Sequence, residues 1–335
     1  MCDPTSGGEY GSDKRRNRNA GMEAVERHAR TKIRLCPVVL WRTGAKFERS
    51  FGTLGGGGGV MEPGIYTMSN SDYHRGPGKK SLSKGGLDQL AKSAAHYKAH
   101  LEQESSPTPA MIFGSQFHCA ALEQDLFKKK YVVDPKIYRR TKAGKAEYAE
   151  FQASLEEKGQ SVITQDNLDL INRMVESMYK SEIAASLLTD GIAESSIFWN
   201  HPKWGFSCKC RPDFLNEKHK IAIDLKTTTD ASPQAFAKAI VNYKYHWQAS
   251  HYLAGINQII SPDYEEFVFI AIEKTPPYAV QNYILKRDDI YLAEEQIKPL
   301  YAQFAECISS DIWPGPTDRI QVVDLPGWYY KNALD

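Results

Sequence analysis

Two aspartates and a lysine near the middle of the chain have the types and spacing of a metal-dependent hydrolytic site. Asp213 and Asp224 are separated by ten residues, and Lys226 follows two positions after Asp224. If the segments that carry the aspartates pair as antiparallel strands across a short turn near 216–219, both carboxylates meet at one sheet edge. Adjacent carboxylates repel each other unless a cation or proton intervenes, and hard oxygen ligands favour Mg²⁺ or Mn²⁺.

Lys226 is predicted to lie on the same face as Asp224, because side chains alternate along a strand. A metal ion lowers the pKa of a bound water, and a neighbouring ammonium stabilises the negative charge that develops on a phosphate. The alternative is a solvated surface cluster with an ordinary salt bridge. However, the residues around Asp224 are apolar on both faces of the segment 221–225. The charges are therefore expected at the end of a buried strand, where they must be paired or metal-bound.

The elements that must position these residues indicate one mixed α/β domain. Apolar residues at helical spacing predict helices near 83–101, 110–126, 141–158, 164–187, 233–242, 245–259 and 288–309. Short β-rich segments predict strands near 192–199, 206–211, 220–227, 266–273 and 278–285, the first three as a consecutive meander. This order indicates an α/β fold with a mixed central sheet flanked by helices.

Composition gives the chain no global charge bias. Its 335 residues carry 42 Lys+Arg against 41 Asp+Glu, so contact with nucleic acid would need a local patch. Residues 1–60 hold 11 of the 24 glycines and a net charge of +5 (11 basic minus 6 acidic), which leaves −4 for 61–335. The leader is either a basic arm that touches nucleic acid or a segment without folded structure, with Met61 as the native start. We favour the second interpretation on composition.

Cysteine usage and hydropathy favour an intracellular location. The six cysteines are scattered without a CxxC pair, and the N-terminus has no charged-then-apolar signal sequence. No apolar stretch approaches the ~20 residues of a membrane-spanning helix. We therefore expect a cytoplasmic protein with no membrane partner.

Several motifs in the same order resemble a known nuclease family. The pair Pro212-Asp213 and Asp224-Leu225-Lys226 resembles the PD-(D/E)xK signature of restriction-endonuclease-like nucleases. Two flanking segments resemble the RecB-like branch of that superfamily, through its helical histidine and its QxxxY motif: Gly114 to His118, and Gln248 to Tyr252. Three early segments resemble the start of the RecE-type exonuclease domain, that of exodeoxyribonuclease VIII: 63–66, 69–74 and 81–84. The resemblance covers about residues 61 to 330.

The resemblance implies a ligand set for a divalent metal. It assigns His118, Asp213, Asp224 and the backbone carbonyl of Leu225 as ligands, with Lys226 orienting the attacking water. A lone histidine on an apolar helix is more often a core residue, and the family match reverses that expectation. Because imidazole departs from the all-oxygen preference of Mg²⁺, Mn²⁺ is an alternative cofactor.

Three further residues receive roles from the same resemblance. Glu194 matches an acidic residue near the metal in relatives, with an ordinary exposed strand carboxylate as the equal alternative. Gln248 and Tyr252 lie four residues apart, on one helical face, and would support the site or the DNA backbone. A half-buried amide and a core aromatic are their alternative roles.

The resemblance also implies a substrate and partners. It indicates a 5′-to-3′ exonuclease on linear double-stranded DNA, which leaves 3′ single-stranded tails for phage or prophage recombination by annealing. A ring-shaped homo-oligomer (trimer or tetramer) and a single-strand annealing protein are the implied partners. Contacts with DNA or its 5′-phosphate are expected from Lys79, Lys80, Ser83 and Lys84, of which Ser83 suits a phosphate at a helix N-terminus. A solvated face is the alternative for the lysines.

Two other functions stay open at this point. One is a PD-(D/E)xK endonuclease or single-strand nuclease, and the other is a catalytically silent DNA-binding module on the same fold. A silent relative has no need to keep Asp213, Asp224 and Lys226 together, which argues against the module.

Overall fold

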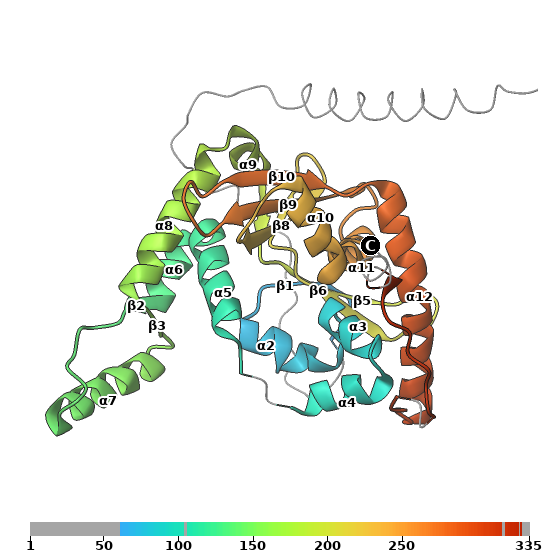
Figure 1. Ribbon diagram of the computed structural model, residues 1–335, viewed down its shortest axis with the longest axis horizontal. Helices are drawn as coiled ribbons and strands as arrows, with labels where there is room; N and C mark the ends of the chain where they lie inside the picture. The colour runs from blue at the N-terminus through green and yellow to red at the C-terminus, as the bar shows by residue number, and fades with distance from the viewer. Residues whose placement is uncertain (1–60, 104–105, 317–318, 328, 330–335) are drawn as a thin grey trace, which may run out of the picture. The chain divides into compact units, whose positions relative to one another are not determined.

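A computed structural model describes residues 61–103, 106–316, 319–327 and 329. The leader expected over 1–60 lies outside these residues. The described chain contains a five-stranded sheet, a three-stranded sheet and a two-stranded pair, with helices between and around them (Figure 1).

The five-stranded sheet is mixed, as the sequence predicts. Its order is β10-β9-β8-β7-β4, and only β8 and β9 run parallel. The other neighbours pair antiparallel. The strands are β4 (Gly191–Ala193), β7 (Phe214–Asn216), β8 (Ile221–Thr228), β9 (Glu266–Glu273) and β10 (Val280–Ile284).

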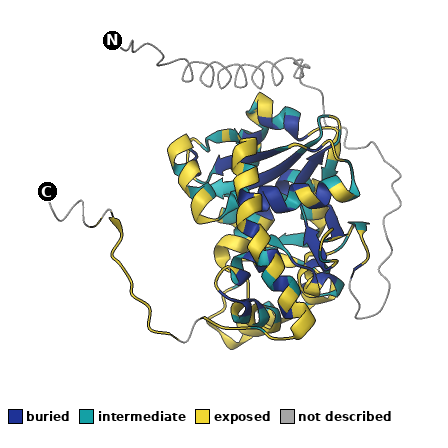
Figure 2. Cartoon of the chain, turned by 90° about the vertical axis from the view of Figure 1, so that its right-hand side faces the viewer, coloured by how far each residue is buried: buried dark blue, intermediate teal, exposed yellow. Residues whose placement is uncertain are grey.

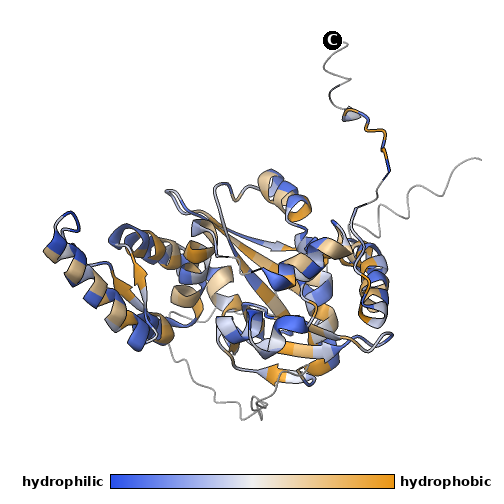
Figure 3. Ribbon diagram, turned by 90° about the horizontal axis from the view of Figure 1, so that it is seen from below, coloured by the Kyte–Doolittle hydropathy of each residue, from blue (hydrophilic) through white to orange (hydrophobic). Residues whose placement is uncertain are grey.

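Helices cover both faces of this sheet (Figure 1). On one face, α5 (Pro109–Leu122) and α8 (Gln165–Lys180) bury apolar side chains against β8 and β9: Phe117, Met174, Leu225 and Ile270. On the other face, α10 (Pro233–Asn242), α11 (Tyr245–Ile259) and α12 (Arg287–Ser310) do the same: Phe236, Trp247, Ile297 and Phe269. Buried residues concentrate in the strands, and exposed ones line the outer sides of the helices (Figure 2). Hydropathy follows the same division, with apolar strands inside (Figure 3). The α/β class is confirmed.

The three-stranded sheet has the order β1-β5-β6 and is antiparallel. Its strands are β1 (Gly64–Tyr66), β5 (Ser196–Asn200) and β6 (Ser207–Cys210). Helix α11 packs closely on β5, because a Cβ built at Gly255 would lie 2.4 Å from the Trp199 ring. That close approach fixes α11, and with it every side chain the helix presents to the larger sheet.

The segment 69–80 is held on the smaller sheet by two basic residues, Lys209 and Arg211. The Lys209 ammonium donates to the carbonyls of Tyr73 at 2.7 Å and Gly78 at 2.9 Å. Arg211 donates to the Ser196 hydroxyl and to the Asn70 side chain. This segment contains α2 (Asn70–His74) and the 3-10 helix η1 (Pro77–Lys80).

Serine caps and chain breaks divide three of the predicted helices. The helix expected over 83–101 is two helices, α3 (Lys84–Leu90) and α4 (Ala94–Glu102), because the Ser93 hydroxyl accepts the His96 N–H and starts a new helix. The helix expected over 164–187 ends at Lys180, where Ser181 caps α9 (Glu182–Leu187). The helix expected over 110–126 is α5 followed by α6 (Gln124–Lys130).

The predicted three-strand meander is wrong. The segments near 192–199 and 206–211 contribute β5 and β6 to the smaller sheet, whereas β7 and β8 form a hairpin in the larger one. The remaining elements, β2 (Tyr131–Val133), β3 (Ser161–Ile163) and α7 (Lys142–Glu157), lie at the side that carries α6 (Figure 1).

Candidate metal and active site

The β7–β8 hairpin brings the two aspartates together. Phe214 pairs with Ile223, so Asp213, one residue before β7, continues that register to face Asp224. The Asp213 Oδ2 accepts the backbone N–H of Leu225 at 2.6 Å, which locks the carboxylate across the two strands. The aspartates were expected at the ends of their strands, and this needs a correction: Asp213 precedes β7, and Asp224 lies in the middle of β8.

A second group of ligand atoms surrounds Asp213. Ligand atoms of His118, Glu194 and Asp213 all lie within 4.8 Å of one another. The His118 Nδ1 is 3.3 Å from the Asp213 Oδ1. Helix α5 supplies His118, and the turn between β4 and β5 supplies Glu194. The predicted histidine and the predicted glutamate therefore converge on the first aspartate.

Glu194 reaches this position through an unusual backbone conformation. Its φ is 49°, in the left-handed region that side-chain-bearing residues seldom adopt. Its N–H donates to the Asp213 carbonyl at 3.0 Å, which holds the turn against the start of β7. Strained backbone of this kind persists where the surrounding structure fixes it and is concentrated at functional sites.

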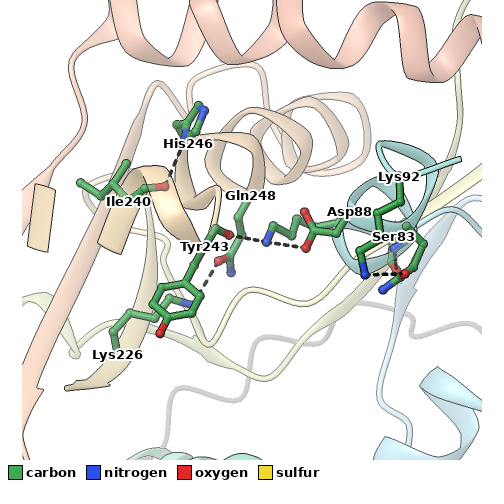
Figure 4. A network of polar contacts seen from close by, with 11 residues as sticks. Ser83, Asp88, Lys92, Lys226, Ile240, Tyr243, His246 and Gln248 are labelled. Atoms are coloured by element: carbon green, nitrogen blue, oxygen red, sulfur yellow. Dashed lines mark hydrogen bonds and ion pairs between the residues drawn. The ribbon is translucent and has the colours of Figure 1, made fainter. Parts of the chain in front are cut away.

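Lys226 and Gln248 complete the site on the side of Asp224. The Lys226 ammonium lies 2.6 Å from the Asp224 Oδ2 and donates to the Gln248 Oε1 at 3.1 Å. The Gln248 Nε2 in turn donates to the Asp224 Oδ1. Figure 4 shows Gln248 pointing from α11 toward Lys226. The predicted common face of Asp224 and Lys226 is present, and the glutamine ties both charges to α11.

The pKa values of the acids follow from burial and from their neighbours. Burial raises the pKa of Asp224, and repulsion by Asp213 raises it further. Burial also opposes the charged form of Asp213, but the attraction and hydrogen bond of His118 lower the pKa of Asp213 below its ordinary value. Burial and the charge of Asp213 raise the pKa of Glu194 to about 8.

The two bases, His118 and Lys226, keep their protons because they lie beside these carboxylates. Burial lowers the pKa of His118, but the carboxylate of Asp213 outweighs it and raises that pKa to about 9. Burial likewise disfavours charged Lys226, whereas Asp224 and Asp213 raise the pKa of its ammonium above the ordinary value. The negative charge of the buried acids is therefore balanced by the protons on His118 and Glu194 and by the ammonium of Lys226.

The donor set fits a divalent cation of the harder kind. Two carboxylates and one imidazole converge in the cluster around Asp213. Asp224 carries a buried oxygen, Oδ2, that lacks a hydrogen bond within the described part of the chain although Lys226 lies beside it. Carboxylate oxygens suit Mg²⁺ and Mn²⁺, and an imidazole ligand shifts the preference toward Mn²⁺.

Other predicted residues lie outside this arrangement. Tyr252 packs edge-on to Phe267 in the core, and the described residues show no hydrogen bond from it to the acids or to Lys226. The Ser83 hydroxyl caps α3 by accepting the Gly86 N–H at 3.2 Å. Lys84 is half-buried against Asp88 and the carbonyl of Tyr243, and η1 carries two exposed lysines, Lys79 and Lys80.

One aromatic residue at the site is absent from the sequence prediction. The Lys226 ammonium lies 4.5 Å from the centre of the Tyr245 ring, a favourable cation–π position. The clustering of Tyr243, Tyr245 and Trp247 immediately before Gln248 is the sequence signal that points to it.

The sheet, its flanking helices and the paired acids with Lys226 define a PD-(D/E)xK nuclease-like domain. The chain belongs to the family described as PDDEXK-like domain of unknown function (DUF3799), whose model matches residues 83–326. The comparison supports the superfamily; the narrower resemblance to RecE-type exonucleases stays a prediction.

A solved structure supports the same fold. It is that of a protein from Eubacterium rectale provisionally named an exonuclease, with a TM-score of 0.54, 12% identity, and coverage of 78% of this chain and 96% of that one. The structure of the protein SSO0001 matches with a TM-score of 0.25, 16% identity and coverage of 61% and 97%, and carries no argument here. A comparison with curated proteins finds no match. Within the described residues, no helix is long and apolar enough to cross a membrane.

Proposed function

We propose that this protein is a divalent-metal-dependent deoxyribonuclease that degrades linear double-stranded DNA from the 5′ end and leaves 3′ single-stranded tails. The observation that carries the nuclease proposal is the juxtaposition of Asp213 and Asp224 with Lys226 held between Asp224 and Gln248. The duplex preference, the polarity and the role in recombination by annealing rest on the resemblance to RecE-type exonucleases.

The residues of the site divide into a metal-holding group and a group that acts on the reacting phosphate. We assign His118, Glu194, Asp213, Asp224 and the backbone carbonyl of Leu225 as candidate ligands. A divalent cation bound there, Mg²⁺ or in its place Mn²⁺, would polarise the scissile phosphate and lower the pKa of the attacking water.

Lys226 has the position of the group that stabilises charge on the phosphate. Its side chain is half-buried, and its ammonium is fixed by Asp224, Gln248 and the face of Tyr245. The neighbouring carboxylates raise the pKa of the ammonium, which favours its charged form. A fixed positive charge that faces developing negative charge needs no reorganisation during the reaction, which is the main advantage of such sites. Tyr252, one turn after Gln248 on α11, would act by supporting that helix against the core.

DNA contacts are proposed at the start of the domain. The exposed Lys79 and Lys80 would meet the phosphate backbone, which attracts lysine without regard to sequence. Lys84 and Ser83 would act at a 5′-phosphate only by rearranging, because the lysine is paired with Asp88 and the hydroxyl caps α3.

The wider biology is proposed on the family resemblance alone. It comprises a ring-shaped trimer or tetramer around DNA, a single-strand annealing protein as partner, and a cytoplasmic location in a bacterial or phage-infected cell. Light scattering on the purified protein measures the oligomeric state, and a monomer would contradict the ring.

The decisive experiment compares linear and covalently closed circular duplex DNA with Mg²⁺ or Mn²⁺ and with a chelator. We expect metal-dependent digestion of the linear form only, with a 5′ label released before a 3′ label. Digestion of the circle would indicate an endonuclease, and binding without cleavage under any of these conditions would indicate a silent DNA-binding module.

The matched variants for this assay are Lys226→Ala and Lys218→Ala. Lys218 is an exposed lysine in the turn between β7 and β8. We expect Lys226→Ala to lower the cleavage rate by about 100-fold or more, the effect of removing one fixed charge-stabilising group, with DNA binding retained. Unchanged cleavage by Lys226→Ala would remove this lysine from the mechanism.

A further inference from the structure

An exposed tyrosine lies at the end of an aromatic stack that begins beside Lys226. Tyr243 is 62% exposed, in the two-residue connection between α10 and α11. Its ring stacks on Tyr245 with centroids 5.5 Å apart and an interplanar angle of 24°. Tyr245 stacks in the same way on Phe269 in the core, at 5.5 Å and 29°. The stack therefore runs from the interior of the sheet to the surface.

This aromatic stack passes beside Lys226. The Lys226 ammonium lies 4.5 Å from the Tyr245 ring centre, so only one aromatic ring separates Lys226 from the exposed tyrosine. Figure 4 shows Tyr243 and Lys226 within the same network of polar contacts. A flat group resting on the outer face of Tyr243 would be separated from Lys226, the group assigned to the phosphate, by the two stacked rings of Tyr243 and Tyr245.

The backbone of Tyr243 is fixed, although its ring is exposed. Its carbonyl accepts the Lys84 ammonium at 2.6 Å, and its N–H donates to the carbonyl of Ala239 at 2.9 Å. The next residue, Lys244, has a φ of 53°, which turns the chain sharply into α11. A rigid aromatic side chain on a fixed backbone loses little conformational entropy on binding.

Three lysines lie near the connection that carries Tyr243: Lys84 donates to the Tyr243 carbonyl, Lys244 is the next residue, and Lys226 lies over the neighbouring Tyr245 ring. Burial lowers the pKa of Lys84 below its ordinary value. The hydrogen bond and charge of Asp88 oppose this shift, and the charges of Lys226 and Lys244 add a smaller lowering. The Lys244 ammonium also lies over the Trp247 ring, 4.2 Å from its centre. A ligand that is planar and uncharged on one side and anionic on the other matches this combination.

We propose that Tyr243 is a nucleobase-stacking residue that receives an unpaired base of the DNA strand at the site, while the neighbouring lysines face its phosphates. Nucleic acid without a defined sequence is bound elsewhere in this manner, through aromatic platforms within a basic groove. The inference deepens the proposed nuclease function and rests on it. Tyr243 is assigned to binding and not to the chemical step.

The test measures binding of a fluorescent single-stranded oligothymidylate in the presence of a chelator, which prevents cleavage. Tyr243→Ala should weaken binding by about tenfold or more, the usual effect of removing one stacking aromatic. Tyr243→Phe keeps the ring and should bind within about twofold of the parent protein, since stacking and not the hydroxyl carries the interaction. Tyr291→Ala is the matched control, because Tyr291 on α12 is also 62% exposed.

An abasic oligonucleotide of the same length separates base stacking from the alternatives. The difference between Tyr243→Ala and the parent should vanish on this ligand, which has phosphates but no bases. Equal affinity of the two proteins for oligothymidylate, or the same loss on the abasic ligand, would overturn the proposal. A change in the oligomeric state of Tyr243→Ala in light scattering would also overturn the proposal, because the Tyr243 side chain would then belong to a subunit interface.

Metal-dependent cleavage of the same oligonucleotide and of linear duplex is measured in parallel. Tyr243-dependent binding without any cleavage would refute the nuclease function and leave the stacking residue in place. Cleavage with Tyr243-independent binding would refute only the stacking proposal.

Discussion

Gln248 is the residue whose removal tests the arrangement of the site most directly. Its amide bonds two charged partners at once, donating to Asp224 and accepting from Lys226 at 3.1 Å. Hydrogen bonds to charged groups contribute about 1.5–3 kcal/mol each. In Gln248→Ala, Lys226 keeps its contact with Asp224 at 2.6 Å, so part of the loss is recovered. We expect the free energy of unfolding to fall by about 2–4 kcal/mol.

This loss corresponds to a Tm lower by roughly 3–6 °C for a chain of this size, measured by urea and thermal unfolding in chelator. Gln258→Ala is the control on the same helix, because its exposed amide bonds only a backbone carbonyl, that of Asn200. That variant should stay within about 0.5 kcal/mol of the parent, as most surface substitutions do.

Activity should change in a way that stability alone does not predict. Without Gln248 the Lys226 ammonium keeps Asp224 and the Tyr245 and Phe269 rings but loses a directional hydrogen bond, so its direction is less well defined. A misplacement of about 1 Å lowers rates by roughly 100-fold. We expect kcat to fall by about 10–100-fold at a temperature where the variant is folded, with KM changed much less, because Gln248 is buried and bonds Lys226 and Asp224.

Gln248→Glu gives the same site a pH-dependent defect. The new carboxyl is buried beside Asp224 and also contacts Lys226. We expect burial and repulsion by Asp224 to outweigh Lys226, as burial and Asp213 do for Asp224 itself, and to raise the folded-state pKa above the unfolded value of about 4.3. A raised acid pKa means that stability relative to the parent is lost as pH rises above about 4.3. The reasoning is refuted if Gln248→Ala retains full stability and full kcat, or if Gln248→Glu shows no added pH dependence.

Two further predictions concern metal binding and acid stability. At 100 times its Kd, Mn²⁺ should add about 2.7 kcal/mol to the free energy of unfolding, and a chelator should remove this gain. In thermal scans, Asp213→Asn should abolish the gain. Asp263→Asn, at an exposed aspartate, is the control and should keep it. Burial lowers the pKa of His251 to about 4, so stability should fall by about 1.4 kcal/mol per pH unit between pH 6.5 and 4, where only the unfolded chain takes up the proton. His251→Gln should lose this part of the slope in urea unfolding, and an identical slope would contradict a neutral buried imidazole.

The centre of the site was predictable because it depends on local strand geometry. A hairpin with a short turn fixes which residues face each other, so the spacing of Asp213 and Asp224 was enough to place them together. The same rule of alternation placed Lys226 beside Asp224. The helices α10 and α11 were also predictable to the residue, since Ser232-Pro233 marks the first and a dense apolar pattern the second.

Long-range pairing was not predictable from the same patterns. Nothing local distinguishes β6, which pairs with β5 in the smaller sheet, from a strand that continues into β7. Periodicity also continued across the breaks at Ser93 and Ser181, where a hydroxyl caps the following helix. In both cases a tertiary contact or a cap decided between structures that the hydropathy pattern leaves equivalent.

Two residues with left-handed backbone conformations flank the site: Glu194, to which the family resemblance pointed, and Lys244, to which no sequence pattern pointed. Glu194 (φ 49°) aims an acid at Asp213 and His118, and Lys244 (φ 53°) separates the exposed Tyr243 from Tyr245. A residue other than glycine loses roughly 1–2 kcal/mol in this conformation, which glycine would avoid. Glycine at position 194 would remove the carboxylate itself, and glycine at position 244 would remove one of the ammonium groups near Tyr243. Under the proposed function, the strained residue in each turn supplies a side chain that the site uses, a carboxylate at position 194 and an ammonium at position 244.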